Sequence, residues 1–277
     1  MNYNNMVLFT DLDGTLLSYH GDNSFLTTKN RLAINKFQSE GGLCSVATGR
    51  NLLNAKKPLS NMDISLPMVL VNGALIVDEL TEAILYKSVL NQDFLDEAIQ
   101  FVKNNSDIIL ILSDIYQLYF VTSGEMSKLP SLDFKAERLA YNELPTKEFL
   151  KATFLVQKAD FNQYLQKVNE FNNIDKVNII PSSSQFIEVV NKEVSKGNAI
   201  LKILTWKNLL GKTLTCIGDY LNDEEMLQIA DYAFVPENGH PSLKKEGRFI
   251  TSNSDLDAVV DMFRILDEVT NNDSENR

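Results

Sequence analysis

Two aspartates, two residues apart, stand at the end of the first apolar segment of the chain. Residues 6–10 are apolar enough for a buried strand, and Asp11 and Asp13 follow directly, with Gly14 permitting a turn. In an open α/β sheet, ligands bind beyond the carboxyl ends of the strands. Two carboxylates that share such a space repel each other unless a cation or a shared proton lies between them. The pair therefore predicts a reactive or cation-binding site, with a solvated turn as the alternative.

A hydroxyl and a glycine amide follow the second apolar strand pattern, residues 43–47. Thr48 and Gly49, followed by Arg50, lead into a predicted helix at 51–59. Phosphate accepts hydrogen bonds from hydroxyls and from the backbone N–H groups at a helix N-terminus. This segment therefore indicates a phosphate site, although Thr-Gly before a helix is also a common cap.

A lysine stands at the start of the predicted helix 195–210, where its charge is unfavourable. Lysine stabilises the C-terminal end of a helix, so Lys196 at the N-terminal end is misplaced unless it faces an anion. The alternative is an ordinary surface lysine.

More carboxylates follow the predicted strand 213–218. Asp219 would emerge beside the first aspartate pair if the two strands are neighbours, and Asn222 and Asp223 come directly after it. Three or four carboxylates around one point specify a hard, oxygen-preferring cation, for which Mg²⁺ is the first choice. Asn222 and Asp223 can also cap the next helix, and the two roles are compatible.

The elements around these motifs alternate between strand and helix. The predicted strands are residues 6–10, 43–47, 67–71, 74–77, 213–218, 233–235 and 249–251, and the predicted helices are 28–40, 51–59, 195–210, 222–230, 240–246 and 254–269. Asn72-Gly73 predicts a hairpin turn between residues 67–71 and 74–77. This alternation predicts an α/β fold with a doubly wound, mostly parallel, Rossmann-like sheet.

The middle of the chain has a different pattern, with longer strands that alternate less regularly with helices. Its predicted strands are 84–87, 108–112, 117–121, 152–156, 177–180 and 186–190, and its predicted helices are 92–104 and 160–171. We interpret residues 83–190 as an inserted α+β domain, and residues 1–82 plus 191–277 as the α/β core.

The composition narrows the class of partner. The 277 residues carry 26 Lys and Arg against 37 Asp and Glu, a net charge of −11, which argues against non-specific nucleic-acid binding. The apolar run near the N-terminus is too short for an export signal or a membrane span. Cys44 and Cys216 lie in apolar runs and are expected to be reduced core thiols. We expect a cytoplasmic protein with a small-molecule partner and predict no oligomeric state.

Four motifs, in this order along the chain, resemble those of the haloacid dehalogenase-like superfamily. They are Asp-Leu-Asp-Gly-Thr at 11–15, Ala-Thr-Gly-Arg at 47–50, Ser-Lys-Gly at 195–197 and Gly-Asp-Tyr-Leu-Asn-Asp at 218–223. The insert between the second and third motifs, together with Val-Asn-Gly-Ala at 71–74, is similar to the Cof-type phosphatases with a type IIB cap. The resemblance covers nearly the whole chain.

The resemblance implies a catalytic centre with a metal ion. Asp11 would be the nucleophile that takes the phosphoryl group, and Asp13 would protonate the leaving alcohol and then activate water. Mg²⁺ would be bound by Asp11, the main-chain carbonyl of Asp13, and Asp219, with Asp223 supporting the metal directly or through another ligand.

The resemblance also implies the groups that hold the phosphoryl oxygens and the substrate. These are Thr48, Lys196 and Asn222, the backbone amides of Leu12 and Gly49, and Arg50. Phosphoryl transfer needs in-line positioning and charge neutralisation, and this set supplies both.

The resulting hypothesis is a Mg²⁺-dependent phosphatase that acts on a small phosphorylated metabolite, a sugar phosphate or a phosphorylated cofactor. The insert would cover the leaving group, and a substrate loop is suggested near Gly124, Lys128, Asp133 and Arg138. A phosphomutase or phosphotransferase would use the same four motifs. A non-catalytic regulatory protein that keeps this fold would be expected to lack at least one of the charged motif residues. This class is disfavoured, because all four are present: Asp11, Asp13, Lys196 and Asp219.

Overall fold

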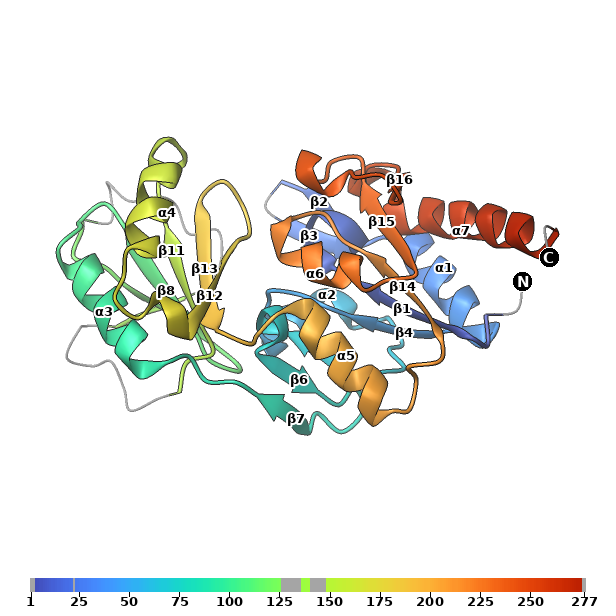
Figure 1. Cartoon of the computed structure of the whole chain (residues 1–277), viewed down its shortest axis with the longest axis horizontal. Coiled ribbons are helices and arrows are strands. Elements are labelled where there is room, and N and C mark those ends of the chain that lie inside the picture. Colours follow the sequence, from blue (N-terminus) through green and yellow to red (C-terminus); the bar gives the residue numbers. More distant parts are fainter. Residues whose placement is uncertain (1–2, 22, 126–135, 140–147, 276–277) are drawn as a thin grey trace.

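The protein folds into two lobes, which the computed structural model places side by side (Figure 1). The structure describes residues 3–21, 23–125, 136–139 and 148–275. Both halves of the chain contribute to the larger lobe, whereas the smaller lobe comes from the middle of the chain.

A parallel sheet forms the centre of the larger lobe. Its strand order is β16-β15-β14-β1-β4, so β1 (Met6–Thr10) lies between β4 (Leu43–Val46) and β14 (Thr213–Ile217). The outer strands are β15 (Tyr232–Pro236) and β16 (Phe249–Thr251). Because the strands that precede Asp11 and Asp219 are neighbours, their carboxyl ends meet at one edge of the sheet, as expected.

A hairpin extends this sheet beyond β4. β5 (Met68–Leu70) meets the end of β4 through a bridge between Ala47 and Val69, and β6 (Leu75–Val77) returns antiparallel to β5, which confirms the predicted hairpin. The connection spans four residues, and Asn72 within it has a φ of 56°. β7 (Ile84–Lys87) pairs with β6, so this strand, which the sequence places in the insert, lies on the core's hairpin.

Helices cover both faces of the central sheet. Along β1, Leu8 packs towards α1 (Thr28–Ser39), α2 (Leu52–Leu59) and α7 (Ala258–Glu275), whereas Val7 and Phe9 pack towards α5 (Lys196–Trp206) and α6 (Glu224–Gln228). Successive residues of a strand point to opposite faces, so a strand with apolar residues at every position is buried on both sides. The fold is therefore the doubly wound α/β architecture that the sequence predicts.

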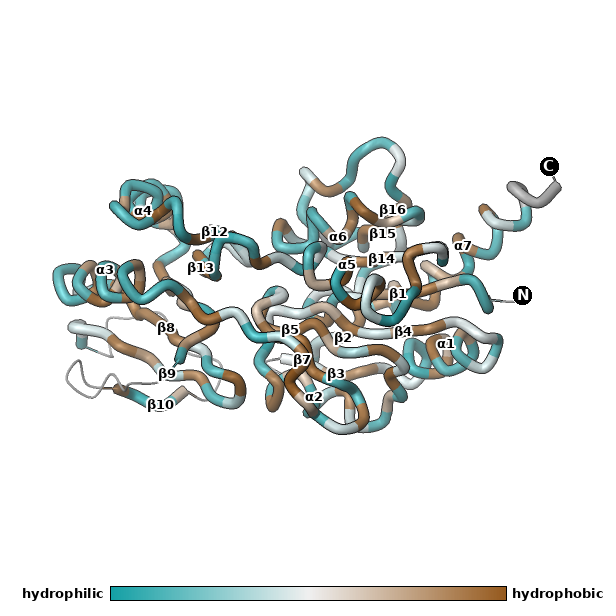
Figure 2. The backbone as a smooth tube through the Cα atoms, turned by 60° about the horizontal axis from the view of Figure 1, so that its bottom comes forward, coloured by the Kyte–Doolittle hydropathy of each residue, from teal (hydrophilic) through white to brown (hydrophobic). Residues whose placement is uncertain are grey.

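The smaller lobe is an antiparallel-rich sheet with two helices on one face. The strand order is β10-β9-β8-β11-β13-β12. The strands are β8 (Ile109–Ser113), β9 (Leu118–Val121), β10 (Glu137–Arg138), β11 (Lys151–Leu155), β12 (Val177–Pro181) and β13 (Phe186–Asn191). Helices α3 (Gln92–Lys103) and α4 (Phe161–Asn169) pack on alternate residues of these strands. The tube in Figure 2 is mostly hydrophobic along β8 and β9. The lobe is α+β, as predicted.

Some predicted elements are wrong in extent or type. The helix predicted at 240–246 is a single 3₁₀ turn, Pro241–Leu243. α5 ends at Trp206 and not at 210, because Asn208 adopts a left-handed conformation (φ 55°), a common way to end a helix. Asp257 (φ 61°) likewise separates a 3₁₀ turn, Ser254–Leu256, from α7. The antiparallel hairpin of β2 (Leu17–His20) and β3 (Asn23–Leu26) was not predicted.

Within the part of the chain that the structure describes, every helix is too short or too polar to cross a lipid bilayer.

Candidate active site

Asp11 continues the line of β1 and is almost fully buried. Its backbone N–H donates to the carbonyl of Ile217 at 2.9 Å, so the parallel pairing with β14 extends one residue beyond the strand. The side chain is 7% exposed, and its Oδ1 accepts a hydrogen bond from Lys196 Nζ at 2.6 Å. The strand therefore fixes the direction of this carboxylate.

Lys196 is the charge centre of the site. Ser195 caps α5 by accepting from the N–H of Asn198, so Lys196 is the first residue of the helix. The side chain is fully buried, and Nζ lies 2.6 Å from Asp11 Oδ1 and 2.6 Å from Asp223 Oδ1. Burial alone would lower the pKa of Lys196, but the two carboxylates raise it above its ordinary value. Lys196 therefore faces two anionic side chains and is not a surface lysine, whereas its predicted contact with a phosphoryl group stays a prediction.

Asp223 connects Lys196 to the loop that carries Asp219. Its Oδ1 is taken by Lys196, and its Oδ2 accepts from the backbone N–H groups of Asp219 (2.9 Å) and Tyr220 (3.1 Å). Asp223 therefore caps the turn Leu221–Asp223 before α6, the alternative role that its position suggested. With both oxygens engaged, Asp223 is suited to orienting the neighbouring groups.

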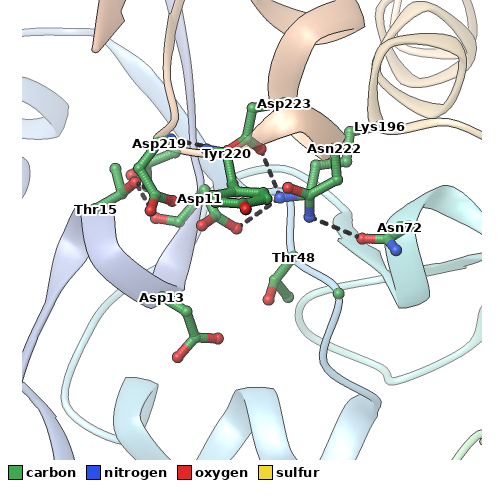
Figure 3. Close-up of polar contacts among 12 residues, drawn as sticks. Asp11, Asp13, Thr15, Thr48, Asn72, Lys196, Asp219, Tyr220, Asn222 and Asp223 are labelled. Carbon is green, nitrogen blue, oxygen red and sulfur yellow. Dashed lines mark hydrogen bonds and ion pairs between the residues drawn. The ribbon is translucent and has the colours of Figure 1, made fainter. Parts of the chain in front are cut away.

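Three carboxylates converge at this edge of the sheet. Ligand atoms of Asp11, Asp219 and Asp223 lie within 4.8 Å of one another (Figure 3). Burial raises the pKa of Asp11 and that of Asp219 above the ordinary range, and the negative charge of Asp223 raises both further. Gly14 permits this approach, since a Cβ on Gly14 would lie 2.3 Å from Asp219 Oδ2.

These residues fit a hard divalent cation. Lys196 supplies one positive charge to three carboxylates, so a further cation would keep Asp11 and Asp219 ionised. The donors are carboxylate oxygens, which Mg²⁺ prefers. The prediction that the main-chain carbonyl of Asp13 is a further ligand stays a prediction.

Thr48 and Gly49 lie at the end of β4, on the other side of Asp11. Thr48 is buried, and its Oγ1 accepts from the N–H of Arg50 at 3.2 Å. A Cβ on Gly49 would lie 3.0 Å from Asn72 Oδ1, so this position leaves little room for a side chain. The structure brings this motif and the aspartate motif to neighbouring strand ends, the arrangement expected of a phosphate site.

Asp13 projects away from the other carboxylates. In Figure 3 its side chain points away from Asp11 and Lys196. Arg50 binds it through two nitrogens, with Nε 2.7 Å from Oδ2 and Nη2 in contact with Oδ1. The partial burial of this carboxylate opposes ionisation, but the Arg50 guanidinium holds the pKa of Asp13 below its usual range. Arg50, predicted to bind phosphate or substrate, is paired here with the proposed acid–base residue.

Asn222 and Leu12 also lie at this edge. Asn222 Nδ2 donates to Asn72 Oδ1 at 3.2 Å, and the side chain of Leu12 is buried in the core, so that only its backbone can serve the site. The suggested substrate loop stays a prediction. Lys128 and Asp133 lie outside the described residues, and Arg138 is exposed on the edge strand β10.

Two charged residues of the smaller lobe, Lys151 and Glu188, reach this site and were missed in the sequence. Lys151 Nζ donates to the carbonyl oxygen of Gly49 at 2.9 Å and to Glu188 Oε1 at 2.5 Å. Glu188 Oε2 accepts from Asn72 Nδ2. A signal was present, because each is a charged residue in an otherwise apolar strand, but nothing local says what it faces.

Comparison with known proteins identifies the family of the chain. The sequence profile of the haloacid dehalogenase-like hydrolases matches residues 8–263. The chain belongs to this family. The resemblance seen in the four motifs is therefore confirmed.

Two relatives and one solved structure illustrate the range of this hydrolase family. A protein of Buchnera aphidicola subsp. Schizaphis graminum (strain Sg) is 31% identical over 249 residues, covering 86% of each chain. A 5-amino-6-(5-phospho-D-ribitylamino)uracil phosphatase of Bacillus subtilis (strain 168) is 23% identical, covering 90% of this chain and 93% of its own. The HAD subclass IIB sugar phosphatase BT4131 has the same fold, with a TM-score of 0.80 at 20% identity and coverage of 94% and 98%. The chain is a phosphatase-type hydrolase of the haloacid dehalogenase-like family.

Proposed function

We propose that the protein is a Mg²⁺-dependent phosphatase that hydrolyses a small phosphorylated metabolite through an aspartyl-phosphate at Asp11. The observation that carries the proposal is the contact of one buried ammonium, Lys196 Nζ, with both Asp11 and Asp223, beside the carboxylate of Asp219. This arrangement holds a carboxylate in a position to attack, and a bound Mg²⁺ would offset the negative charge of the arriving phosphoryl group.

The reaction would proceed in two displacements. Asp11 attacks phosphorus, the bond from phosphorus to the leaving oxygen breaks, and that oxygen takes a proton from Asp13. Asp13 must be neutral for this step, although Arg50 favours its ionised form in this structure. Asp13 then takes a proton from water while the water oxygen attacks phosphorus, which breaks the aspartyl bond and releases phosphate. Thr48, Lys196 and the amides of Leu12 and Gly49 would hold the phosphoryl oxygens. Mg²⁺, when bound by Asp11 and Asp219, would supply positive charge for the transferring group.

The substrate would be a sugar phosphate or a phosphorylated cofactor. The B. subtilis relative acts on a phosphorylated ribitylamino compound, and BT4131 is a sugar phosphatase. Both names describe small polyhydroxylated phosphates. The smaller lobe reaches the loop that carries Thr48 and Gly49 through Lys151. The surface of this lobe is therefore close enough to contact a leaving group.

We also propose that the protein acts in the cytoplasm on a small molecule and without a nucleic-acid or membrane partner. Both cysteines are buried and unpaired, which supports a reducing compartment. The net charge of −11 supports a small-molecule substrate over a nucleic acid.

The test is phosphate release from a panel of phosphorylated sugars, nucleotides, amino acids and cofactors, with Mg²⁺ and with EDTA. We expect Mg²⁺-dependent phosphate release confined to one chemical class. In Asp11→Asn the rate of release should fall by at least about 10³-fold, while the temperature of thermal unfolding stays largely unchanged. Asp96→Asn, on the exposed face of α3, is the matched control and should be unchanged. Activity retained in Asp11→Asn would place the nucleophile elsewhere, and silence on every compound, including an aryl phosphate, would refute the phosphatase.

A further inference from the structure

Hydrogen bonds, and not packing, fix the direction of the Asp13 carboxylate. The side chain is 42% exposed, so neighbouring atoms leave it room to turn. Arg50 donates from Nε to Oδ2 and from Nη2 to Oδ1. The hydroxyl of Tyr19 donates to Oδ1 as well, at 2.5 Å. Each of these bonds has an ionised partner, the strong class of protein hydrogen bond.

Tyr19 belongs to the hairpin of β2 and β3, which presents two hydroxyls to this ion pair. Tyr19 and Ser24 are direct partners across the hairpin, and such partners lie on the same face. Ser24 Oγ accepts from Arg50 Nη2 at 2.8 Å, while Tyr19 binds Asp13. One cross-strand pair therefore supports both members of the ion pair.

The hairpin is itself docked on the core. Ser18 Oγ donates to the carbonyl of Ser254 at 3.0 Å, and the N–H of Tyr19 donates to Asp255 Oδ1 at 3.0 Å. These bonds place the backbone of the strand on the turn Ser254–Leu256. The phenol of Tyr19 therefore extends towards Asp13 from a fixed base.

The three hydrogen bonds are distributed unequally over the two carboxylate oxygens. A carboxylate offers about four acceptor positions, two on each oxygen. Oδ1 accepts from both Tyr19 and Arg50, whereas Oδ2 accepts from Arg50. The remaining acceptor position therefore lies on Oδ2.

We propose that Tyr19 is a positioning residue for Asp13, and that its hydroxyl, together with Arg50, leaves Oδ2 as the oxygen that exchanges protons with the substrate and with water. This inference rests on the proposed function. In the second displacement, Oδ2 takes a proton from water as the water oxygen bonds to phosphorus and the bond from phosphorus to Asp11 breaks. Without the Tyr19 hydroxyl, Asp13 turns more freely and this step slows.

The experiment is a rapid-mixing measurement of nitrophenolate release from p-nitrophenyl phosphate with Mg²⁺. Nitrophenolate leaves without a proton, so the first displacement depends little on Asp13, whereas the attack of water depends on it fully. Tyr19→Phe should show a burst approaching one nitrophenolate per enzyme, followed by a steady state about tenfold slower than that of the wild type.

The matched control is Tyr164→Phe. The Tyr164 hydroxyl donates to Asp107 Oδ2 at 2.6 Å in the smaller lobe, so this variant loses the same kind of hydrogen bond at a tyrosine that we assign no role in the site. Its progress curve should match that of the wild type. Ser24→Ala, which removes an acceptor of Arg50, should slow the steady state by about threefold.

Each other outcome overturns the inference. If the progress curve of Tyr19→Phe matches that of the wild type, the Tyr19–Asp13 contact has no part in turnover. If the burst and the steady state are slowed equally, the role of Tyr19 is structural. If the wild type turns over and Tyr19→Phe shows no burst, this inference fails alone. If the wild type does not release nitrophenolate, the proposed function fails and this inference fails with it.

Discussion

Two buried lysines, one from each lobe, lie near the carboxyl ends of neighbouring strands of the core sheet, and they have different partners. Lys196 comes from the core and contacts two carboxylates, Asp11 and Asp223, each at 2.6 Å. Lys151 comes from the smaller lobe and contacts one carboxylate, Glu188, together with the carbonyl of Gly49. Their side chains are 0% and 9% exposed.

The difference shows two uses of a buried ion pair. Removing charges from water is costly, and a buried pair is kept only where its geometry and further hydrogen bonds compensate. Around Lys196 the carboxylates outnumber the ammonium, an excess of negative charge that is suited to binding a cation. Around Lys151 the charges balance, and Glu188 has a partner at each oxygen, Lys151 at one and Asn72 at the other. The second pair connects the lobes at the loop that carries Gly49.

The largest effect is expected from Lys196→Met. This change leaves Asp11 and Asp223 buried without their cation, so we expect a loss of about 3–5 kcal/mol in the free energy of unfolding and of at least about 10³-fold in phosphate release. Denaturant unfolding and turnover would measure the two losses. Lys192→Met, at an exposed lysine, should stay within about 0.5 kcal/mol of the wild type. Near-normal turnover in Lys196→Met would remove the distinction between the two lysines.

Lys151→Met should affect stability more than chemistry. Glu188 would remain buried beside Asn72 without its ammonium, and we expect a loss of about 3 kcal/mol in unfolding free energy. Turnover of a small aryl phosphate should fall by no more than about tenfold, since Lys151 contacts Gly49 and none of the three clustered carboxylates. A loss of turnover as large as that in Lys196→Met would show that this pair takes part in the reaction.

A double-mutant cycle would separate the Lys151–Glu188 interaction from its surroundings. Glu188→Gln keeps an acceptor for Asn72 but removes the charge. The double variant Lys151→Met/Glu188→Gln should therefore lose less unfolding free energy than the two single variants lose together. We expect a coupling of about 1–3 kcal/mol from denaturant unfolding of the four proteins. Additive losses would mean that the two side chains stabilise the lobes independently.

The smallest effect is expected at a partly exposed ion pair, Glu224 with Lys245 and Arg248. Burial opposes ionisation, but these two cations lower the pKa of Glu224 from 4.5 to about 2. A lowered pKa stabilises the fold above pH 4.5, and this contribution is lost as the pH falls towards 2. Glu224→Gln should therefore be less stable than the wild type by no more than about 1 kcal/mol at pH 7, with the difference vanishing in acid. A difference that grows in acid would contradict the sign of this shift.

The strands and the motifs were predictable because their signals are local. The boundaries of β1 and β16 agree with the apolar runs at residues 6–10 and 249–251, and the cap residues Thr27 and Asn51 precede the helices expected after them. The C-terminal end of α5 and the start of α7 were not predictable, because the left-handed residues that set them, Asn208 and Asp257, leave a weaker mark in the sequence than glycine. The hairpin of β2 and β3 has little apolar alternation, and docking on the turn at Ser254 holds it in place.

The sequence by itself determined the residue types of the site and their positions at strand ends, because periodicity and motif order are written in neighbouring residues. It therefore indicated Asp11, Thr48, Lys196 and Asp219 together. The tertiary structure decided which groups meet across long separations. Tyr19 and Arg50 converge on Asp13, and Glu188 meets Asn72 from the other lobe, 116 residues away. Such contacts depend on strand order and on how the lobes pack, and neither is contained in a local pattern.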